Sequence, residues 1–164
     1  MSRLDTAIRR LEGGRDCINL AVELIDGQRG LVFDLGLGNG RTYDHLRELL
    51  PQHEIYVFEN DLRAHPDSSP DPDHLLIGDI RETLPAAVAR FGPGAVLIHC
   101  DIGGPDRLAN DELASFVGAQ LPGLIAPGGY AMASRDIGWQ GAEPVKLPPT
   151  LDPGDYFIYR APDA

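Results

Sequence analysis

The stretch LVFDLGLGNGRTYDHL, residues 31–46, holds a glycine-rich turn between an apolar run and a segment with helical spacing. The run LVFDL predicts a buried strand that ends at glycines, and RTYDHLRELL, residues 41–50, predicts a helix that stops before Pro51. A strand, a glycine turn and a helix in this order are typical of a nucleotide-binding unit. The first question is therefore which ligand the turn would hold.

The rest of the chain alternates between strand-like and helix-like patterns. Further short apolar runs, each predicted as a buried strand, lie at residues 54–59, 74–79, 95–101 and 128–136. Amphipathic segments between them predict helices at 108–125 and at 80–91, where Pro85 is expected to set the first turn. Because strands alternate with crossover helices, we predict an α/β fold with a mostly parallel sheet and helices on both faces.

Both ends of the chain depart from this alternation. Residues 3–26 carry apolar residues at helical spacing, and the pair Gly13-Gly14 is expected to divide them into two helices. The C-terminal segment predicts an antiparallel hairpin between 145–147 and 156–160, which brings the sheet to seven strands. We expect a single domain over residues 1–164. Its parts are an N-terminal helical segment at 1–27 and a cofactor-binding sheet core at 30–164.

Composition disfavours several classes of protein. The chain has 164 residues, 43% of them hydrophobic, and a formal net charge of −11, so its averaged field disfavours nucleic acid and anionic membranes as partners. No apolar run is long enough to span a membrane, and residues 1–10 lack the apolar segment of a signal peptide. Cys17 and Cys100 match no metal or redox spacing and are interpreted as reduced thiols in or near the core. These features predict a cytoplasmic protein.

The first four predicted strands each end on an acidic residue, namely Asp34, Glu59, Asp79 and Asp101. In a parallel sheet these ends meet at one edge, where ligands bind outside the carboxyl ends of the strands. A single acid in such a place is often only a helix cap or a turn former. Acids on successive strands are better explained if they accept hydrogen bonds from hydroxyl, amine or cationic groups of a ligand.

The glycine turn does not match the fingerprint of a dinucleotide site. That fingerprint, G-x-G-x-x-G, needs a third glycine for close packing of helix on strand, and Arg41 stands in this position. The turn instead reads D-x-G-x-G-x-G from Asp34 to Gly40. A carboxylate here would repel a pyrophosphate, whereas it would accept an ammonium group or organise the amides of the turn. A nicotinamide-dependent reductase therefore requires that arginine be tolerated in place of glycine.

These motifs resemble those of the class I methyltransferases that use S-adenosylmethionine. The resemblance covers residues 31 to about 160 and rests on the segments VFDLGLGNG, VFEND, LLIGDI and VLIHCDIGG, which agree with that family in order, spacing and strand context. The chain is also similar to a family of small bacterial methyltransferases of about this length, and the resemblance assigns no acceptor. It implies a Rossmann-like methyltransferase fold, S-adenosylmethionine as the cofactor and transferase activity.

The resemblance also implies roles for the residues at the strand ends. The turn at 36–40 would wrap the amino-acid part of the cofactor, Glu59 would accept hydrogen bonds from the ribose hydroxyls, and Asp79 with Ile80 would flank the adenine. Asp101 would lie near the methionine amine or the transferred methyl group, and it is the candidate catalytic residue. The predicted cofactor site as a whole consists of Asp34, Leu35, Gly36, Gly38, Asn39, Gly40, Glu59, Asn60, Gly78, Asp79, Ile80 and Asp101.

Methyl transfer needs a base only when the attacking atom must lose a proton. Besides Asp101, the candidates near the expected site are His99, Asp136 and Tyr43. Strand alternation points His99 and Asp101 the same way, and a histidine in an apolar strand is more often a satisfied core residue. Asp101 and Asp136 could ligate a divalent metal, as in metal-dependent catechol methyltransferases. However, Ile137 replaces the asparagine that those enzymes carry, so no metal is predicted.

The connection after the fifth strand is shorter than in the family pattern. Residues 137–147 leave no room for the usual covering helix, so one sheet face is expected to be bare and to invite a partner subunit. Trp139 is expected to fill this gap as a core residue, or else to lie at a dimer seam. Arg15, Arg41 and Arg135 could bind an acidic acceptor, although exposed arginines are usually only solvated.

The absence of an inserted substrate domain leaves three sources for the acceptor pocket: the N-terminal helices, the loop after the fourth strand and a neighbouring chain. Two functions remain open. The favoured one is an S-adenosylmethionine-dependent methyltransferase with a small-molecule acceptor, working as a homodimer or higher homo-oligomer. The alternative is a catalytically silent module that binds S-adenosylmethionine or S-adenosylhomocysteine to sense or regulate. Only the acceptor side separates them, because an enzyme needs a polar group that can reach the transferred methyl.

Overall fold

A seven-stranded sheet forms the centre of the computed structural model, which describes residues 1–164. The strand order is β3-β2-β1-β4-β5-β7-β6. Strands β1 to β5 run parallel, whereas β7 pairs antiparallel with both β5 and β6. This topology confirms the predicted mostly parallel sheet with an antiparallel C-terminal hairpin. The strands are β1 Leu31–Leu35, β2 Ile55–Glu59, β3 Leu75–Ile77, β4 Ala95–Cys100, β5 Ile125–Ala133, β6 Glu143–Pro144 and β7 Phe157–Arg160.

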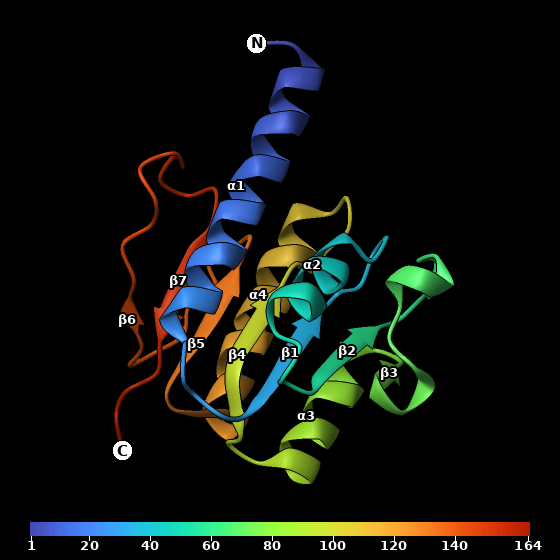
Figure 1. The fold of residues 1–164 in the computed structure, drawn as a ribbon, viewed down its shortest axis with the longest axis vertical. Helices are drawn as coiled ribbons and strands as arrows, with labels where there is room; N and C mark the ends of the chain where they lie inside the picture. Colours follow the sequence, from blue (N-terminus) through green and yellow to red (C-terminus); the bar gives the residue numbers. More distant parts are fainter.

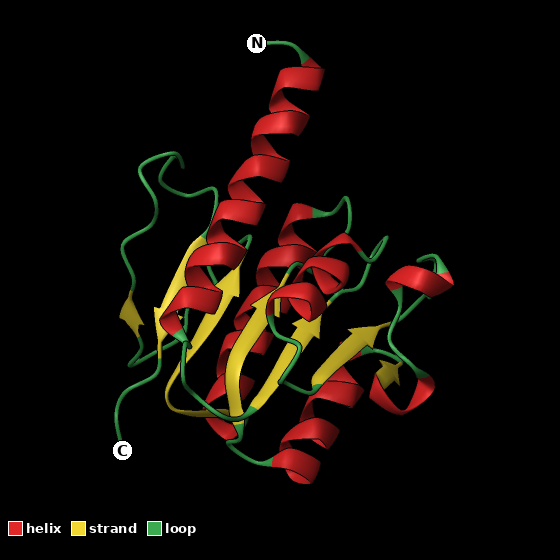
Figure 2. Ribbon diagram, in the orientation of Figure 1, coloured by secondary structure: helices red, strands yellow, loops and turns green.

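Helices cover both faces of the sheet, two on each side (Figures 1 and 2). One face carries α1 Arg3–Leu24 and α2 Arg41–Leu49, and the other carries α3 Ile80–Phe91 and α4 Arg107–Gln120. Short 3-10 turns complete the chain: η1 Pro66–Ser68, η2 Pro72–His74 and η3 Leu121–Gly123. None of the helices combines the length and apolar character that crossing a bilayer requires.

Side-chain alternation along the strands separates two apolar cores. On β1, Val32 packs toward α1 and α2, whereas Phe33 packs toward α3 and α4. Both cysteines are free and buried, Cys17 in the first core and Cys100 in the second, as predicted. Because both faces of the central strands are buried, their sequences read as continuous apolar runs.

Helix α1 is continuous, so the expected break at Gly13-Gly14 is wrong. The two glycines make room for the C-terminal segment, which lies beside α1 in Figure 1. A side chain at Gly13 would collide with Leu151, and a Cβ at Gly14 would lie 2.7 Å from the hydroxyl oxygen of Tyr156. That hydroxyl donates to the carbonyl of Arg10 at 3.1 Å. Tertiary packing thus outweighs the low helix propensity of glycine.

Helix α3 has the predicted bounds, but the expected role of Pro85 is wrong. Because Asp79 caps the helix and Ile80 begins it, Pro85 lies in the helix interior and not in the first turn. Other element boundaries do differ from the predictions. Helix α4 ends at Gln120, just before the η3 turn that contains Pro122, so β5 begins at Ile125. The first strand of the C-terminal hairpin is β6, two residues earlier than the predicted start.

The sheet face that was expected to be bare is covered, so this expectation is wrong. Helix α1 contacts β5 on one side of the sheet. On the other side Trp139 is only 7% exposed and belongs to the same core as Ile137 and Ala133, which confirms its interpretation as a core residue. Its ring centroid lies 6.4 Å from that of Tyr159 on β7. A large aromatic side chain therefore replaces the usual covering helix.

Candidate functional site

A cleft opens at the carboxyl ends of β1 to β4, where parallel α/β sheets bind their ligands. Its volume of about 910 Å³ lies in the range of small-molecule sites. Most of the residues predicted for the cofactor site line this cleft: Gly36, Gly38, Asn39, Glu59, Asn60, Gly78, Asp79, Ile80 and Asp101. The structure thus brings together acids from the ends of segments that are distant in sequence.

Glu59 connects the glycine turn to the end of β2. Its Oε2 accepts a hydrogen bond from the amide of Gly38 at 2.9 Å. Its Oε1 accepts from the amides of Asn60 at 2.8 Å and Asp61 at 3.1 Å. The carboxylate is therefore held in place at the cleft, and an oxygen with a single backbone partner keeps a lone pair for a ligand.

The turn itself requires glycine for two different reasons. Gly36 has a φ of +98°, and a Cβ there would lie 2.6 Å from the carbonyl oxygen of Asp101, so only glycine lets the loop after β4 approach β1. Gly38 has a φ of +55°, but no atom lies within 4 Å of the position of its Cβ. Gly36 therefore serves packing, whereas Gly38 leaves the cleft open beside its backbone.

Three residues of the predicted cofactor site do not line the cleft. Asp34 is fully buried and faces His99, Leu35 is fully buried in the core, and Gly40 forms the N-cap of α2. A Cβ at Gly40 would collide with the backbone of Ser68. These three residues do not face the cleft and affect it only through the position of the turn.

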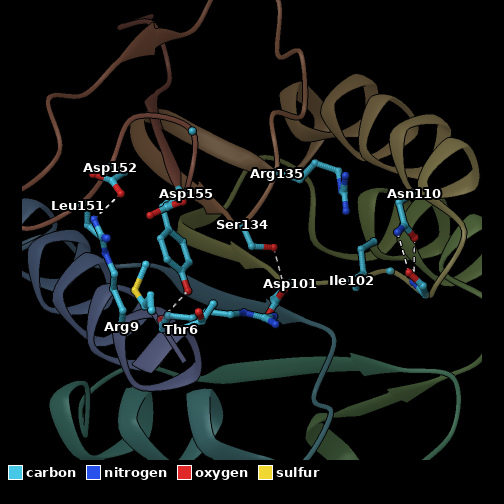
Figure 3. A pocket seen from close by; sticks show the side chains of 16 residues that line it. Thr6, Arg9, Asp101, Ile102, Asn110, Ser134, Arg135, Leu151, Asp152 and Asp155 are labelled. Atoms are coloured by element: carbon cyan, nitrogen blue, oxygen red, sulfur yellow. Dashed lines mark hydrogen bonds and ion pairs between the residues drawn. The ribbon is translucent and has the colours of Figure 1, made fainter. Parts of the chain in front are cut away.

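Two further acids at the cleft have defined partners. Asp79 accepts a hydrogen bond from the amide of Arg81 at 2.9 Å and so caps α3. Asp101 accepts from the hydroxyl of Ser134 at 2.7 Å (Figure 3). The other carboxylate oxygen of Asp101 lies 3.9 Å from the guanidinium of Arg10. Asp101 is thus oriented by β5 and α1 together.

Two more cavities meet the cleft at Asp101. One, shown in Figure 3, has a volume of about 720 Å³ and lies between α1, the loop after β4 and the C-terminal segment. The other has a volume of about 770 Å³ and lies between α1 and the glycine turn. Asp101 lines all three hollows and is the one residue that does so. A molecule in either cavity can therefore approach a molecule in the cleft.

His99 lies in the second of these cavities and forms a buried pair with Asp34. Its Nδ1 is 2.7 Å from Asp34 Oδ1, and its side chain is 5% exposed. Burial acts to lower the pKa of the imidazole, but the hydrogen bond and charge of Asp34, with the charge of Asp101, raise it above 6.5 overall. The interpretation of His99 as a satisfied core histidine holds for Nδ1, which pairs with Asp34, but not for Nε2, which makes no hydrogen bond.

The other candidate bases lie outside these cavities. Asp136 accepts hydrogen bonds from the hydroxyl of Tyr159 at 2.6 Å and the amide of Gly138 at 2.8 Å, which lower its pKa. Tyr43 lies beneath the guanidinium of Arg47 on α2. No group of three or more His, Cys, Asp or Glu side chains is arranged to hold a metal ion.

Sequence reasoning missed the residues that shape the loop after β4. Asn110 on α4 is 8% exposed, and its side chain bonds the amide of Gly104 at 2.7 Å and the carbonyl of Gly104 at 2.8 Å. Ser134, at the end of β5, was missed in the same way. A polar residue on the buried side of an amphipathic helix was the available signal for Asn110.

The arginines singled out in the sequence separate into different environments. Arg15 and Arg41 line the cavity between α1 and the glycine turn, together with Arg10. Arg135 lines the cavity of Figure 3 and pairs with Asp111 at 3.1 Å. Arg41 makes no ion pair.

The chain is similar to one known protein over part of its length and to two solved structures over most of its length. A stretch of 72 residues is 35% identical to the glutamate racemase of Pectobacterium atrosepticum. It covers 43% of this chain but only 24% of the racemase, so the chain spans about a quarter of that curated relative. The apo structure of CalS11, TDP-rhamnose 3'-O-methyltransferase, is similar with a TM-score of 0.63 at 16% identity. That match covers 90% of this chain and 78% of CalS11 and shows the fold alone.

The chain is also similar, at higher sequence identity, to the crystal structure of an S-adenosyl-L-methionine methyl transferase from Silicibacter pomeroyi DSS-3. It has a TM-score of 0.91 and 45% identity and covers 98% of both chains. The family model of the S-adenosyl-L-methionine methyltransferases matches residues 1–161. The glycine turn, the acids at the strand ends and these matches agree, and the chain belongs to this family of methyltransferases.

Proposed function

We propose that this S-adenosylmethionine-dependent methyltransferase acts on a small-molecule acceptor. When bound, S-adenosylmethionine supplies a methyl group on a positively charged sulfur, and the protein has to align the attacking atom with it. The single observation that carries the proposal is the junction at Asp101, where two cavities of small-molecule size open into the cleft. An acceptor in either cavity has a direct route to the cofactor, which a silent binding module would not need.

The cleft fits the cofactor by the chemistry of its lining. We propose that Glu59 accepts hydrogen bonds from the ribose hydroxyls, that Asp79 and Ile80 flank the adenine, and that the turn at 36–40 wraps the methionine part. Asn39, Asn60 and Gly78 would complete the lining, whereas Asp34, Leu35 and Gly40 would act only by shaping the turn. Asp101 stays the candidate catalytic residue, because it alone lines the cleft and both cavities.

A small acceptor is supported by charge and by size. The net charge of −11 disfavours a nucleic-acid acceptor. The two cavities, of about 720 and 770 Å³, suit molecules of drug-like size or smaller. The same charge disfavours anionic membranes, and the free, buried cysteines support a cytoplasmic location.

We also propose that the whole chain acts as one methyltransferase domain and that two or more copies associate through the N-terminal half of α1. This half projects beyond the sheet in Figure 1. Leu4, Ile8 and Leu11 lie on it at helical spacing and are 68%, 45% and 54% exposed, which is unusual for an apolar stripe of a monomer. Light scattering should therefore give more than one chain per particle, and Leu4→Gln with Ile8→Gln should yield a monomer. A monomeric wild-type protein would refute this association.

The central proposal is tested by binding and transfer on the purified protein. Calorimetry should show that S-adenosylmethionine and S-adenosylhomocysteine bind and that NADH does not. Methyl-labelled cofactor should then transfer its label to the low-molecular-mass filtrate of a bacterial extract, and not to the protein or nucleic-acid fraction. Binding without any transfer would support the silent regulatory module, and transfer to a macromolecular fraction would refute the small acceptor.

A further inference from the structure

The neutral form of His99 has a defined arrangement of protons. Asp34 cannot donate as a carboxylate, so the 2.7 Å contact to Oδ1 places the proton of the neutral imidazole on Nδ1. The lone pair of the ring is then on Nε2. Asp34 and His99 are register partners on β1 and β4, so the backbone of the sheet fixes this geometry. The pair is therefore pre-organised to accept a proton at Nε2.

The Nε2 atom is available to a ligand. This nitrogen makes no hydrogen bond. Only two side-chain nitrogen or oxygen atoms are both fully buried and without a hydrogen-bond partner, namely Asp34 Oδ2 and His53 Nδ1, so His99 Nε2 is not fully buried. His99 Nε2 is therefore accessible, and the hollow that His99 lines is the cavity between α1 and the glycine turn. The unpartnered Asp34 Oδ2 is a second sign of a site, because native proteins rarely leave a fully buried carboxylate oxygen without a hydrogen bond.

The same cavity adjoins the cofactor cleft. Gly36, Gly38, Asn39 and Asp101 line both hollows, so their boundary is the glycine turn and the end of β4. A base can assist methyl transfer only if the attacking atom reaches the methyl carbon and the base together. The shared lining meets this condition for a small molecule in the cavity.

The charged groups around the imidazole favour a negatively charged or polarised acceptor. From the strands and the adjoining loop, His99 is faced by Asp34 and Asp101. The other titratable groups of the cavity come from α1, α2 and the C-terminal segment: Arg10, Glu12, Arg15, Arg41, His45 and Tyr156. Arg10 faces Asp101 at 3.9 Å, and Arg15 faces Asp16 at 3.5 Å. Arg41 makes no ion pair, so its guanidinium is free to stabilise an oxyanion that develops during proton removal.

Resting on the proposed function, we propose that His99 is the general base of the transfer, that Asp34 positions it, and that the cavity between α1 and the glycine turn binds a small acceptor with a hydroxyl group. A carboxylate has no proton to lose at neutral pH, whereas a hydroxyl is a weak nucleophile until a base takes its proton, so a built-in base favours O-methylation of a hydroxyl.

The step balances without any further reactant. The hydroxyl oxygen forms the bond to the methyl carbon, and the carbon–sulfur bond breaks with its electron pair going to sulfur. The hydroxyl proton passes to His99 Nε2, and the imidazolium is paired with the carboxylate of Asp34. The proton then leaves Nε2 for solvent through the cavity that His99 lines.

Two measurements on the ligand-free protein test the pair directly. Nitrogen-15 NMR of the imidazoles should show that neutral His99 carries its proton on Nδ1, and that Asp34→Asn lowers the pKa of His99. A proton on Nε2 of the neutral ring would overturn the proposal, because that nitrogen could not accept another. An unchanged pKa in Asp34→Asn would remove the role of Asp34.

Access to Nε2 is tested with diethyl pyrocarbonate, which acylates neutral imidazole nitrogens. His99 should be modified at a rate that rises with pH through its pKa, as mapped by mass spectrometry. His65, with a side chain that is 73% exposed, is the positive control. His53 is the negative control, because its Nδ1 is fully buried and its Nε2 lies 3.1 Å from the carbonyl of Gln28. An unmodified His99 under conditions that modify His65 would overturn the proposal.

The final arm separates this proposal from the proposed function. His99→Gln should bind S-adenosylmethionine with an affinity close to wild type, while its transfer to the small-molecule filtrate falls by about 10²- to 10⁴-fold. The residual rate of His99→Gln should lose the wild-type dependence on pH, and His53→Gln should retain it. Failure of the wild type to bind the cofactor would refute the proposed function, whereas full activity of His99→Gln would refute only the base.

Discussion

Asp34 and His99 are register partners on the neighbouring parallel strands β1 and β4, and their side chains, 0% and 5% exposed, meet at 2.7 Å. An ionisable pair inside a sheet couples the chemistry of this site to the stability of the fold. The charge of Asp101 also acts on His99, and Asp101 lies where the cleft and the cavities meet.

The pair should give the protein a pH-dependent stability. The pKa of His99 is raised above its usual 6.5 in the folded state, so its contribution to the free energy of unfolding is complete below 6.5 and is lost as pH rises through the folded pKa. Denaturant titrations of wild type and His99→Gln should therefore differ more at about pH 5.5 than at about pH 9. The raised pKa of His74 is common to both proteins and cancels in this comparison. A larger difference at the higher pH would contradict the assignment.

Glu59→Ala should weaken the binding of S-adenosylmethionine. The substitution removes an acceptor for the ribose hydroxyls and also the bonds to the amides of Gly38, Asn60 and Asp61. The expected loss is about 1 to 3 kcal/mol, measured by calorimetry. Glu48→Ala, which changes an exposed side chain of α2, should bind as wild type does. Equal affinities for Glu59→Ala and Glu48→Ala would count against the cleft.

Gly36→Ala should damage the turn and the affinity together. The new Cβ would be 2.6 Å from the carbonyl oxygen of Asp101, at a φ of +98° that alanine rarely adopts. Thermal unfolding should report a loss of more than about 1 kcal/mol, with weaker cofactor binding. Gly94→Ala is the matched control, since its Cβ would meet nothing closer than 3.7 Å. A stable Gly36→Ala protein would show that the loop after β4 can move away.

Both cysteine thiols should be inert in the folded protein. Burial, with the charge of Asp16 as a smaller cause, raises the pKa of Cys17 to about 12, and burial raises the pKa of Cys100 to about 12 as well. Iodoacetamide followed by mass spectrometry should label neither residue in the native state and both in denaturant. Rapid native labelling of Cys17 would indicate that α1 separates from the sheet.

The sequence predicted the interior of the molecule better than its ends. The strands β1, β2 and β4 follow from short apolar runs, because these central strands are buried on both faces. The third predicted strand also forms, but as the edge strand β3 it is only partly buried, so its prediction as a buried strand is wrong. The continuity of α1 could not be read, because Gly13-Gly14 is explained only by Leu151 and Tyr156, which lie at the other end of the chain.

The candidate site shows the same division. The glycine turn and Glu59 could be placed from local patterns, since the turn and the strand end carry their own signals. The pairing of Asp34 with His99 depends on the register between β1 and β4, which no local pattern specifies. Asn110 and Ser134 likewise act through contacts that only the folded chain creates.

The residues that line the cleft and those that line the two cavities come from different parts of the chain. Residues 36–113 alone enclose the cleft, whereas α1 and the segment at 151–156 enclose much of the two cavities. Under the proposed function, substitutions in α1 or in the segment at 151–156 should change the choice of acceptor and leave the affinity for the nucleoside unchanged. Libraries designed to alter acceptor preference should therefore be confined to the codons of α1 and of the C-terminal segment, which the glycine pair in α1 allows to pack side by side.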